Sequence, residues 1–587
     1  INIVTKKNRL QGFTGSVGAN TSFGGRYGLT GSLSLRKGKW NVYTNYGFNR
    51  DKTFSEGTSY RETYFRPDAV DVISQVENGN NSKTGHNLKF GVDWNANDKN
   101  TISTSAMLNI GKSEDDNNIL YSFYELGLPI DSLSRRITLG SGMNRNIDAD
   151  FVWKHFFKKK GQLLNFTATA SFDLTKPEND YTDGEYLSEN IPGTYFDLER
   201  DRTVNNNIIY TVSTDYEHPV SDDKKVEAGL KSTIREFDTD VVFEEFSNGT
   251  YLNDTNRTNR FVYSDVLHAA YAQYRQSLGK FGYQIGMRSE YATTEANVIT
   301  TDSIFNKDYF SIYPSAFITY KPNQKSSWKA AYSRRINRPR RGALNPFPNY
   351  DDPRNVRIGN PDLDPEYSDS YEVENMRYIG KFSLTSTLYA RLTKDNIQRY
   401  RRVTNDSLQI TVVTWENLAY SRNYGGEFIF NGSPFKWWNL TLSTNIYYNM
   451  LSAKNLQEDL SSESWTASGR IFTTFKPFKN TDLQVTYFYR PRMKVTQGTM
   501  KDMQMLTIAA SRKVLKEKGI VSVRVSDPFN TQRFGFEFED VTYSQDFTRK
   551  RQSRFVTVSF SYRFGELRDR DQQRMRDRSR EDMDMEG

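Results

Sequence analysis

The sequence contains no cysteine, 4 histidines and 17 prolines in 587 residues. Without cysteine, the chain can form neither a disulfide framework nor a thiol-based catalytic or metal site. The histidines lie far apart, and none has a second histidine four residues away, so we expect no zinc site. They are His86, His155, His218 and His268. No run of about 18 apolar residues occurs, which excludes a transmembrane helix.

Signatures of soluble enzymes and of nucleic-acid binding are also missing. The glycine-rich stretch at 12–32 is no phosphate loop, because no Lys-Ser/Thr pair follows it and no helix can start there. No nucleophile or metal constellation is present, so we expect neither an enzyme nor a cofactor. The 79 basic and 71 acidic residues are interleaved, so the net charge of +8 gives no argument for a nucleic-acid partner.

Large aromatic rings are abundant, although the chain is polar overall. Hydrophobic residues make up only 36% of the chain, yet the chain contains 36 Tyr and 38 Phe. So few apolar residues cannot fill a large conventional core. The rings must instead be spread over a thin apolar surface.

Alternation with a period of two residues runs from one end of the chain to the other. In the segment 439–450, for example, Leu440, Leu442 and Ile446 alternate with polar residues such as Thr441 and Ser443. The same pattern occurs at 39–49, 381–392, 482–490 and 555–564. It predicts strands with one face toward lipid and the other toward water.

The connections between these strands alternate between short and long. Short polar turns are predicted at 36–39, 95–100, 158–162, 218–225, 277–281, 321–326, 378–382, 432–436, 476–482 and 515–519. Longer connections are predicted at 50–85, 112–145, 174–204, 238–258, 338–366, 393–414 and 528–553. The ten short turns predict an all-β fold: a 22-stranded antiparallel transmembrane β-barrel of the outer-membrane type, with short periplasmic turns and long extracellular loops. A lumen of that size is too wide for side chains to fill.

Tryptophan supports the same arrangement. Six of the eight tryptophans lie within a few residues of a predicted short turn: Trp40, Trp94, Trp153, Trp328, Trp437 and Trp438. Amphipathic rings favour the depth of the lipid headgroups, so an aromatic girdle is expected at that rim.

The last predicted strand ends on alternating apolar residues, and it resembles the assembly signal of outer-membrane proteins. The residues concerned are Val558, Phe560, Tyr562 and Phe564. The resemblance implies that the barrel-assembly machinery is a partner, although Phe564 is not the final residue. The charged segment 566–587 that follows is predicted to be a disordered tail in the periplasm.

Several stretches resemble the TonB-dependent outer-membrane receptors. "INIVTKK" (1–7) looks like the last strand of their plug domain, and 334–373, with "LNPF" and "GNPDLDPE", resembles their long mid-barrel loop. The segments 414–428 and 513–530 resemble later strands. The resemblance implies a plug remnant at 1–9, a barrel at 10–565 and the tail at 566–587, with the rest of the plug missing.

The same resemblance implies the function and the partners. A barrel of this family in the outer membrane of a Gram-negative bacterium would import a scarce solute, of the ferric siderophore, oligosaccharide or peptide class. It would contact outer-membrane lipid and, through the missing plug, a TonB-type energy-coupling protein; a surface lipoprotein is a further candidate partner. A passive porin, or a structural barrel in an envelope complex, is the alternative.

Candidate ligand-binding residues are polar or basic residues in and beside the loop at 338–366. They are Arg334, Arg338, Arg340, Arg341, Asn345, Tyr350 and Asn360. The arginines could attract an anionic substrate. They could equally line the lumen and pair with acidic plug residues, and the sequence leaves both readings open.

Overall fold

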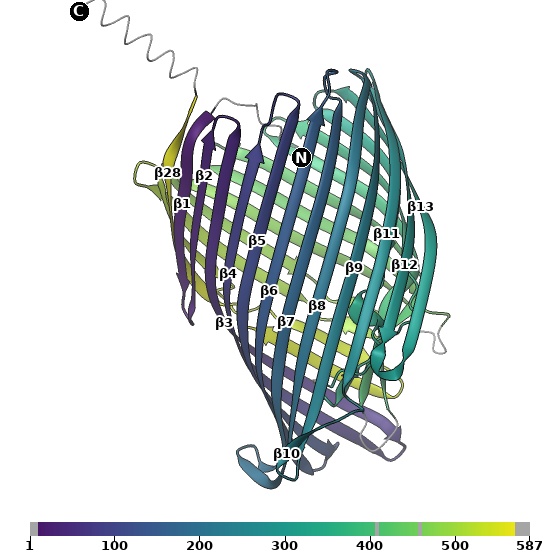
Figure 1. The fold of residues 1–587 in the computed structure, drawn as a ribbon. Coiled ribbons are helices and arrows are strands. Elements are labelled where there is room, and N and C mark those ends of the chain that lie inside the picture. The colour runs from purple at the N-terminus through teal and green to yellow at the C-terminus, as the bar shows by residue number, and fades with distance from the viewer. Residues whose placement is uncertain (1–9, 351, 405–409, 456–460, 570–587) are drawn as a thin grey trace, which may run out of the picture.

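The computed structural model describes residues 10–350, 352–404, 410–455 and 461–569. In these residues, 22 antiparallel strands form the closed wall of a barrel (Figure 1). The wall strands are β1 (Leu10–Ser22), β2 (Arg26–Lys37), β3 (Trp40–Arg66), β4 (Ala69–Trp94), β5 (Asn100–Glu125), β6 (Ser132–Phe156), β7 (Leu163–Ser188), β8 (Ile191–Ser221), β9 (Lys224–Ser247), β11 (Asn259–Leu278), β12 (Phe281–Val298), β13 (Ser303–Asn323), β14 (Ser326–Asn337), β16 (Glu366–Ile379), β17 (Phe382–Val403), β18 (Thr411–Phe435), β19 (Trp438–Ser452), β20 (Ser462–Phe478), β21 (Thr481–Arg490), β24 (Met503–Val514), β25 (Gly519–Ser526) and β28 (Phe555–Asp569).

Smaller elements lie in the connections. They are β10 (Thr250–Asn253), β15 (Asn355–Arg357), β22 (Met493–Val495), β23 (Gly498–Met500), β26 (Phe534–Glu539), β27 (Tyr543–Arg551), the 3₁₀ turn η1 (Ile299–Thr301) and the single-turn helix α1 (Arg341–Leu344). Among the described residues, no helix is long and apolar enough to cross a membrane.

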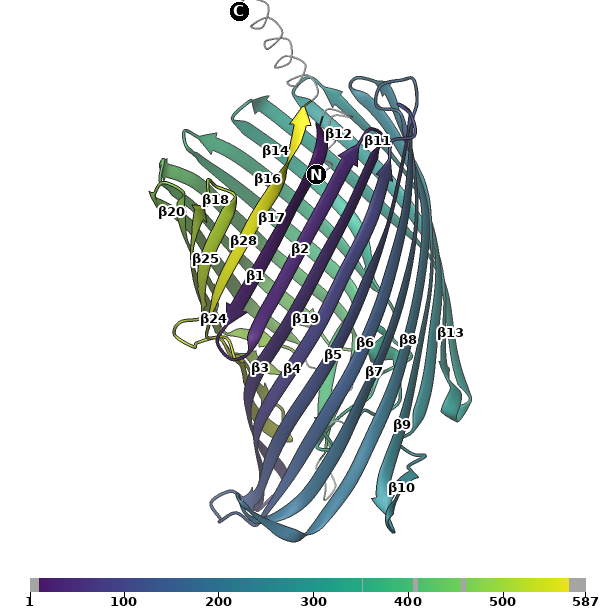
Figure 2. The same ribbon diagram turned by 60° about the vertical axis from the view of Figure 1, so that its left-hand side comes forward.

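The barrel closes where the first and last strands meet, as Figure 2 shows. β1 and β28 pair antiparallel, for example at Val17 with Tyr562. All ten predicted short turns join neighbouring wall strands, and they lie at the rim where β1 begins and β28 ends. The predicted 22-stranded barrel is therefore confirmed, with its short turns at the periplasmic rim.

The outer face of the wall is apolar, as the alternation predicted. Leu442 and Ile446 are 37% and 44% exposed on β19, among a continuous set of exposed apolar side chains. The intervening Asn445 points inward, where its Oδ1 accepts a hydrogen bond of 3.0 Å from the Tyr389 hydroxyl. Lipid therefore meets the apolar face, and the polar face lines the lumen.

The predicted tryptophan girdle is present at the short-turn rim. Trp40 and Trp94 stack across β3 and β4 with their ring centroids 5.2 Å apart. On β18–β20, Trp437 and Trp438 stack on each other and on Phe475. These amphipathic rings mark the periplasmic boundary of the membrane.

The long connections differ from the expectation of loops, because most of their length is strand. β3 and β4 stay paired in one register from Trp40 to Thr63, and after a register shift they end in a tight hairpin where Arg66 faces Ala69. Cross-strand hydrogen bonds satisfy the backbone beyond the membrane, so the hairpins form a tall extracellular collar. Beside the shorter β1, β2 and β28, β27 pairs with the outer half of β3, from Ser55 with Arg551 to Thr63 with Tyr543.

The expected boundary between barrel and tail at residue 565 needs a correction. β28 continues to Asp569, because Leu10 of β1 extends the ladder to that residue. The predicted plug remnant at 1–9 and the rest of the predicted tail, 570–587, lie outside the described residues.

Candidate binding site at the extracellular mouth

The chain enters the barrel after β14. The ladder between β13 and β14 ends at the pair Ser315 and Ser333. The next residue of β13 is Pro314, which has no N–H to donate, so β14 separates from β13 beyond this point. Residues 338–350 and 352–365, which we call the strap, then run along the inner face of the wall.

Arg338 fixes the start of the strap. Its Nη2 donates to Glu290 Oε2 of β12 at 2.6 Å, and its Nε donates to the Tyr309 hydroxyl of β13 at 2.5 Å. Burial disfavours the charged guanidinium, but the bonds to Glu290 and Tyr309 outweigh burial and raise the pKa of Arg338. Arg338 therefore anchors the strap through its ion pair with Glu290, and its charge is already neutralised.

Helix α1 packs on the inner face of the wall at β9, β11 and β12. Leu344 of α1 and Leu363 later in the strap are buried against Phe261 of β11. Beside them, Arg341 Nη1 donates to Asn207 Oδ1 of β8 at 2.6 Å. Apolar burial and a polar anchor together hold this part of the strap against β8, β9 and β11.

The strap continues to the other side of the lumen. Asp352 accepts a 3.1 Å hydrogen bond from the Tyr121 hydroxyl of β5, and the Arg354 guanidinium lies 5.0 Å from the ring centroid of Phe123. β15 pairs in parallel with the start of β18, for example at Val356 with Val412. Contacts with β5, β8, β12 and β18 mean that the strap crosses the mouth of the barrel.

The end of the β17–β18 hairpin (residues 396–404 and 410–418), which we call the tip, joins the strap. Asn360 Nδ2 donates to the Trp415 carbonyl oxygen at 3.1 Å. Gly359 is required here, because a Cβ at this position would lie 2.3 Å from the carbonyl oxygen of Asn345. The strap and the tip together form what we call the cap.

Two cavities lie against the cap, and Asn349 and Arg357 line both of them. The larger has a volume of about 670 Å³. The smaller, of about 360 Å³, is also lined by Ser59 and Asn117. Along β3 and β5 these two residues lie nearer the periplasmic rim than Arg61 and Tyr121, which contact the cap. The smaller cavity therefore lies on the lumen side of the cap.

The larger cavity has a basic and aromatic lining. Its described lining includes four arginines and no carboxylate. The arginines are Arg338, Arg340, Arg357 and Arg399, and the aromatic residues are Phe347 and Trp415. Apart from Arg338, these arginines make no ion pair with a carboxylate among the described residues. Nor do the described residues include three or more His, Asp or Glu side chains grouped to hold a metal ion.

Electrostatic repulsion links the arginines of the two cavities. Arg399 and Arg401 lie 17 and 19 residues beyond Phe382, the first residue of β17, and so are in the collar, outside the membrane. Burial, with the charge of Arg357 adding to it, lowers the pKa of Arg399. Burial lowers the pKa of Arg401 to about 10, and the charges of Arg399 and Arg357 act in the same direction. An anion bound among them would relieve this repulsion.

The residues predicted to bind ligand have different positions. Arg340 and Asn345 line the larger cavity. Arg334 points out of the barrel, where it pairs with Asp369 of β16 at 2.8 Å. The Arg257 guanidinium lies over the ring of Tyr350, with its Cζ 5.8 Å from the ring centroid. Arg338, Arg341 and Asn360 hold the strap in place, as described above.

The sequence reasoning missed Arg357, Arg399, Arg401 and Trp415. In "IQRYRRV" (397–403), two arginines alternate on the face that points inward. This pattern could have marked a basic inner surface. Their gathering with Arg357 depends on the strap crossing the lumen, which no local pattern reveals.

The predicted assembly strand lies on the outer face of β28. Val558 and Phe560 are exposed toward lipid. Phe564 lies over Gly15 of β1, where an added Cβ would be 2.4 Å from the ring. The arrangement suits a lipid-facing seam, and recognition by the assembly machinery remains a prediction.

A model of the outer membrane protein beta-barrel family matches residues 155–562. No curated protein matches the sequence. Among solved structures, the copper transporter OprC has a TM-score of 0.65 at 10% identity, with 95% of this chain and 81% of OprC covered. The siderophore receptor PiuA from Acinetobacter baumannii has a TM-score of 0.60 at 11% identity, with 96% and 82% covered. For the ferric citrate transporter FecA the TM-score is 0.58 at 11% identity, with 95% and 79% covered. At such identities the likeness shows the fold alone.

Proposed function

The chain belongs to the outer membrane protein beta-barrel family, and on that premise we propose that it is a TonB-dependent transporter importing a scarce anionic solute. It resides in the outer membrane of a Gram-negative bacterium, in contact with outer-membrane lipid. The proteins of similar fold are named as transporters and receptors, none of them as an enzyme. Their cargoes, which include copper, siderophores and ferric citrate, support import of a metal chelate.

The basic cavity is the observation that carries the choice of solute. Arg340, Arg357 and Arg399 line it without a carboxylate in the described lining, and Trp415 adds an aromatic face. Guanidinium groups bind carboxylates and phosphates with charge-assisted, often bidentate hydrogen bonds. Of the three solute classes, an anionic ferric siderophore fits this lining better than a neutral oligosaccharide or a peptide.

The cap supports active rather than passive transport. Strap and tip cross the mouth and are tied to several wall strands, including β5 through Tyr121 and β12 through Glu290. A passive porin needs a continuously open channel. We propose that a plug in the lumen couples solute entry to a TonB-type protein, and that the assembly machinery and a surface lipoprotein are further partners.

A binding experiment tests the proposed solute class. Intrinsic tryptophan fluorescence, to which Trp415 contributes, would be followed on the purified full chain, with ferric citrate as the anionic probe and a linear maltooligosaccharide as the neutral one. We expect ferric citrate to bind, and Arg357→Gln with Arg399→Gln to weaken binding by at least about tenfold, since each charged hydrogen bond contributes about 1.5–3 kcal/mol. Arg334→Gln is the matched control, because Arg334 faces outward.

Binding of the maltooligosaccharide alone would refute the anionic class, as would ferric citrate binding that the double variant leaves unchanged. In cells, uptake should stop when an uncoupler collapses the energy of the inner membrane. Uptake that continues would favour the passive porin.

A further inference from the structure

A group of basic side chains faces outward on three neighbouring strands. Lys112 of β5 and Lys176 of β7 both pair with Met143 of β6, and Arg145 lies two residues from Met143. Arg145 is therefore a diagonal neighbour of both lysines, about 7–8 Å away on the same face. We call Lys112, Arg145 and Lys176 the basic patch. All three are exposed.

The patch shares its face with the lipid-facing residues. Ile110 lies two residues before Lys112, and Ile147 two residues after Arg145; both are exposed apolar side chains of the outer wall. Since alternate residues of a strand share a face, the patch continues the lipid-facing surface toward the cell exterior. All three residues of the patch face outward, away from the lumen.

The distance of the patch from the periplasmic rim places it at the extracellular boundary of the membrane. Its members lie 11 to 13 residues from the short-turn ends of their strands, which are Asn100 for β5, Phe156 for β6 and Leu163 for β7. At about 3.3 Å per residue and a tilt of about 40°, this is roughly 28–33 Å from the periplasmic rim. The apolar band of such barrels is about 25 Å tall.

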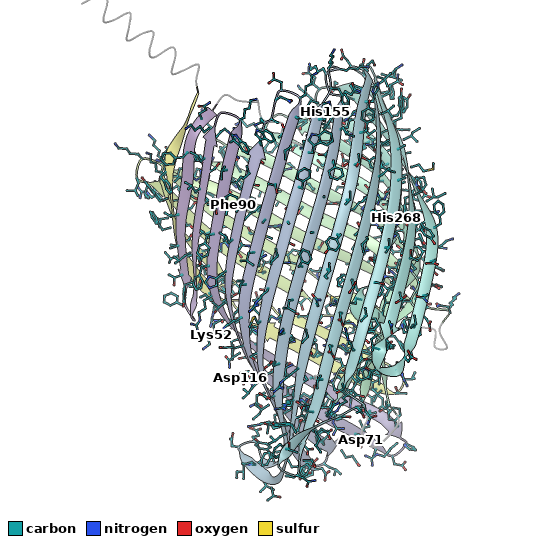
Figure 3. All side chains as sticks on the ribbon, in the orientation of Figure 1. Lys52, Asp71, Phe90, Asp116, His155 and His268 are labelled. Carbon is teal, nitrogen blue, oxygen red and sulfur yellow. The ribbon has the colours of Figure 1, made fainter. Side chains whose placement is uncertain are left out.

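Figure 3 shows the same order along this side of the barrel. Of the three labelled residues here, Phe90, an exposed apolar side chain, lies nearest the short-turn rim, and Lys52 and Asp116 lie progressively farther from it. Lys52 is at the level of the patch, 12 residues beyond Trp40. The patch therefore meets the headgroup layer of the outer leaflet.

None of the three members of the patch forms an ion pair within the described chain. Glu114 and Glu178, the next outward-facing residues on β5 and β7, both lie opposite Ser141 on the extracellular side of the patch, and they form no ion pair with it. The basic character is confined to this part of the wall. On β11, β12 and β13, the outward-facing residues at the same distance from the short-turn ends are uncharged: Val266, Thr293 and Ile312. The three like charges repel one another, and an anionic group bound between them would relieve that repulsion.

We propose that the patch binds the phosphate groups of an anionic glycolipid of the outer leaflet. Lys112 and Lys176 are two strands apart, about 9.5 Å, and Arg145 between them can hold a phosphate by two hydrogen bonds. The acyl chains of such a lipid would lie on the apolar band below, beside Ile110 and Ile147. The site is independent of the solute cavity, which lies inside the barrel.

Native mass spectrometry of the full chain in detergent tests this. The probes are bisphosphorylated lipid A, the same lipid without phosphates, and inorganic phosphate. The test variant is Lys112→Gln, Arg145→Gln and Lys176→Gln together. The control removes three lumen-facing charges: Lys83→Gln, Lys89→Gln and Lys231→Gln.

We expect retention of bisphosphorylated lipid A to fall about a hundredfold in the test variant, since each basic residue at an anionic surface contributes roughly a factor of five. The control should retain the lipid. Equal retention by the test variant, or equal binding of the dephosphorylated lipid, would overturn the proposal. Full competition by millimolar inorganic phosphate would also overturn it, in favour of a free-anion site. Folding of each variant is checked by its resistance to SDS before boiling. The comparison of phosphorylated with dephosphorylated lipid A uses the unaltered chain, so it tests the proposal even if a variant fails to fold.

Discussion

Two hydrogen bonds join Arg401 and Gln497 at the extracellular mouth. The Arg401 N–H donates to Gln497 Oε1 at 2.8 Å, and Gln497 Nε2 donates to the Arg401 carbonyl oxygen at 2.7 Å. Arg401 belongs to the tip, whereas Gln497 lies in the turn between β22 and β23. One side chain thus fastens the tip to the C-terminal part of the collar.

Gln497→Ala should loosen the tip. The variant removes both bonds and leaves buried backbone groups unpaired, at a cost of about 1–3 kcal/mol to local stability. Hydrogen exchange at residues 398–403 should speed up by about fivefold or more, while the membrane-spanning strands keep their protection. Gln484→Ala on β21 is the control, and equal exchange in the two variants would mean that Gln497 does not hold the tip.

Leu442→Arg should destabilise the barrel, because it places a charge in lipid. Leu442 faces outward on β19, four residues beyond Trp438, and a lipid-facing Arg near the midplane costs roughly 2–4 kcal/mol. Ser443→Arg, on the next residue, points into the lumen and should cost much less. Unfolding in urea from lipid vesicles measures both, and the reverse ranking would mean that the strand faces are wrongly assigned.

Glu290→Ala should release the start of the strap. Glu290 is 7% exposed, and its removal leaves the half-buried Arg338 guanidinium without its carboxylate. Breaking one side of such a pair costs about 3–5 kcal/mol. Limited trypsin digestion should then cut within residues 338–365 faster than in the unaltered chain. Glu295→Ala, on the outward face of β12, should leave the digestion rate unchanged, and equal digestion of both variants would contradict this anchor.

Local signals predicted the wall of the barrel well. The alternation around Leu442 and Ser443 fixes which face meets lipid, and each short turn is a local polar sequence. The site was predicted less well, because it depends on long-range contacts. Arg334 was grouped with Arg338 by sequence proximity, yet the first points outward and the second inward. Arg357 and Arg399 come together only because the strap crosses the lumen.

The central claim is that the chain's own strap and tip cap the mouth of the barrel. Single-channel conductance in planar bilayers tests this most directly, with the full chain compared with a variant whose residues 341–363 are replaced by a short Gly-Ser linker. Both samples must first be shown to be folded by their resistance to SDS before boiling. We expect the unaltered chain to conduct weakly, and the linker variant to conduct at least about twofold more, because a 22-stranded lumen is otherwise wide. A large conductance in the unaltered chain that the linker leaves unchanged would contradict the cap.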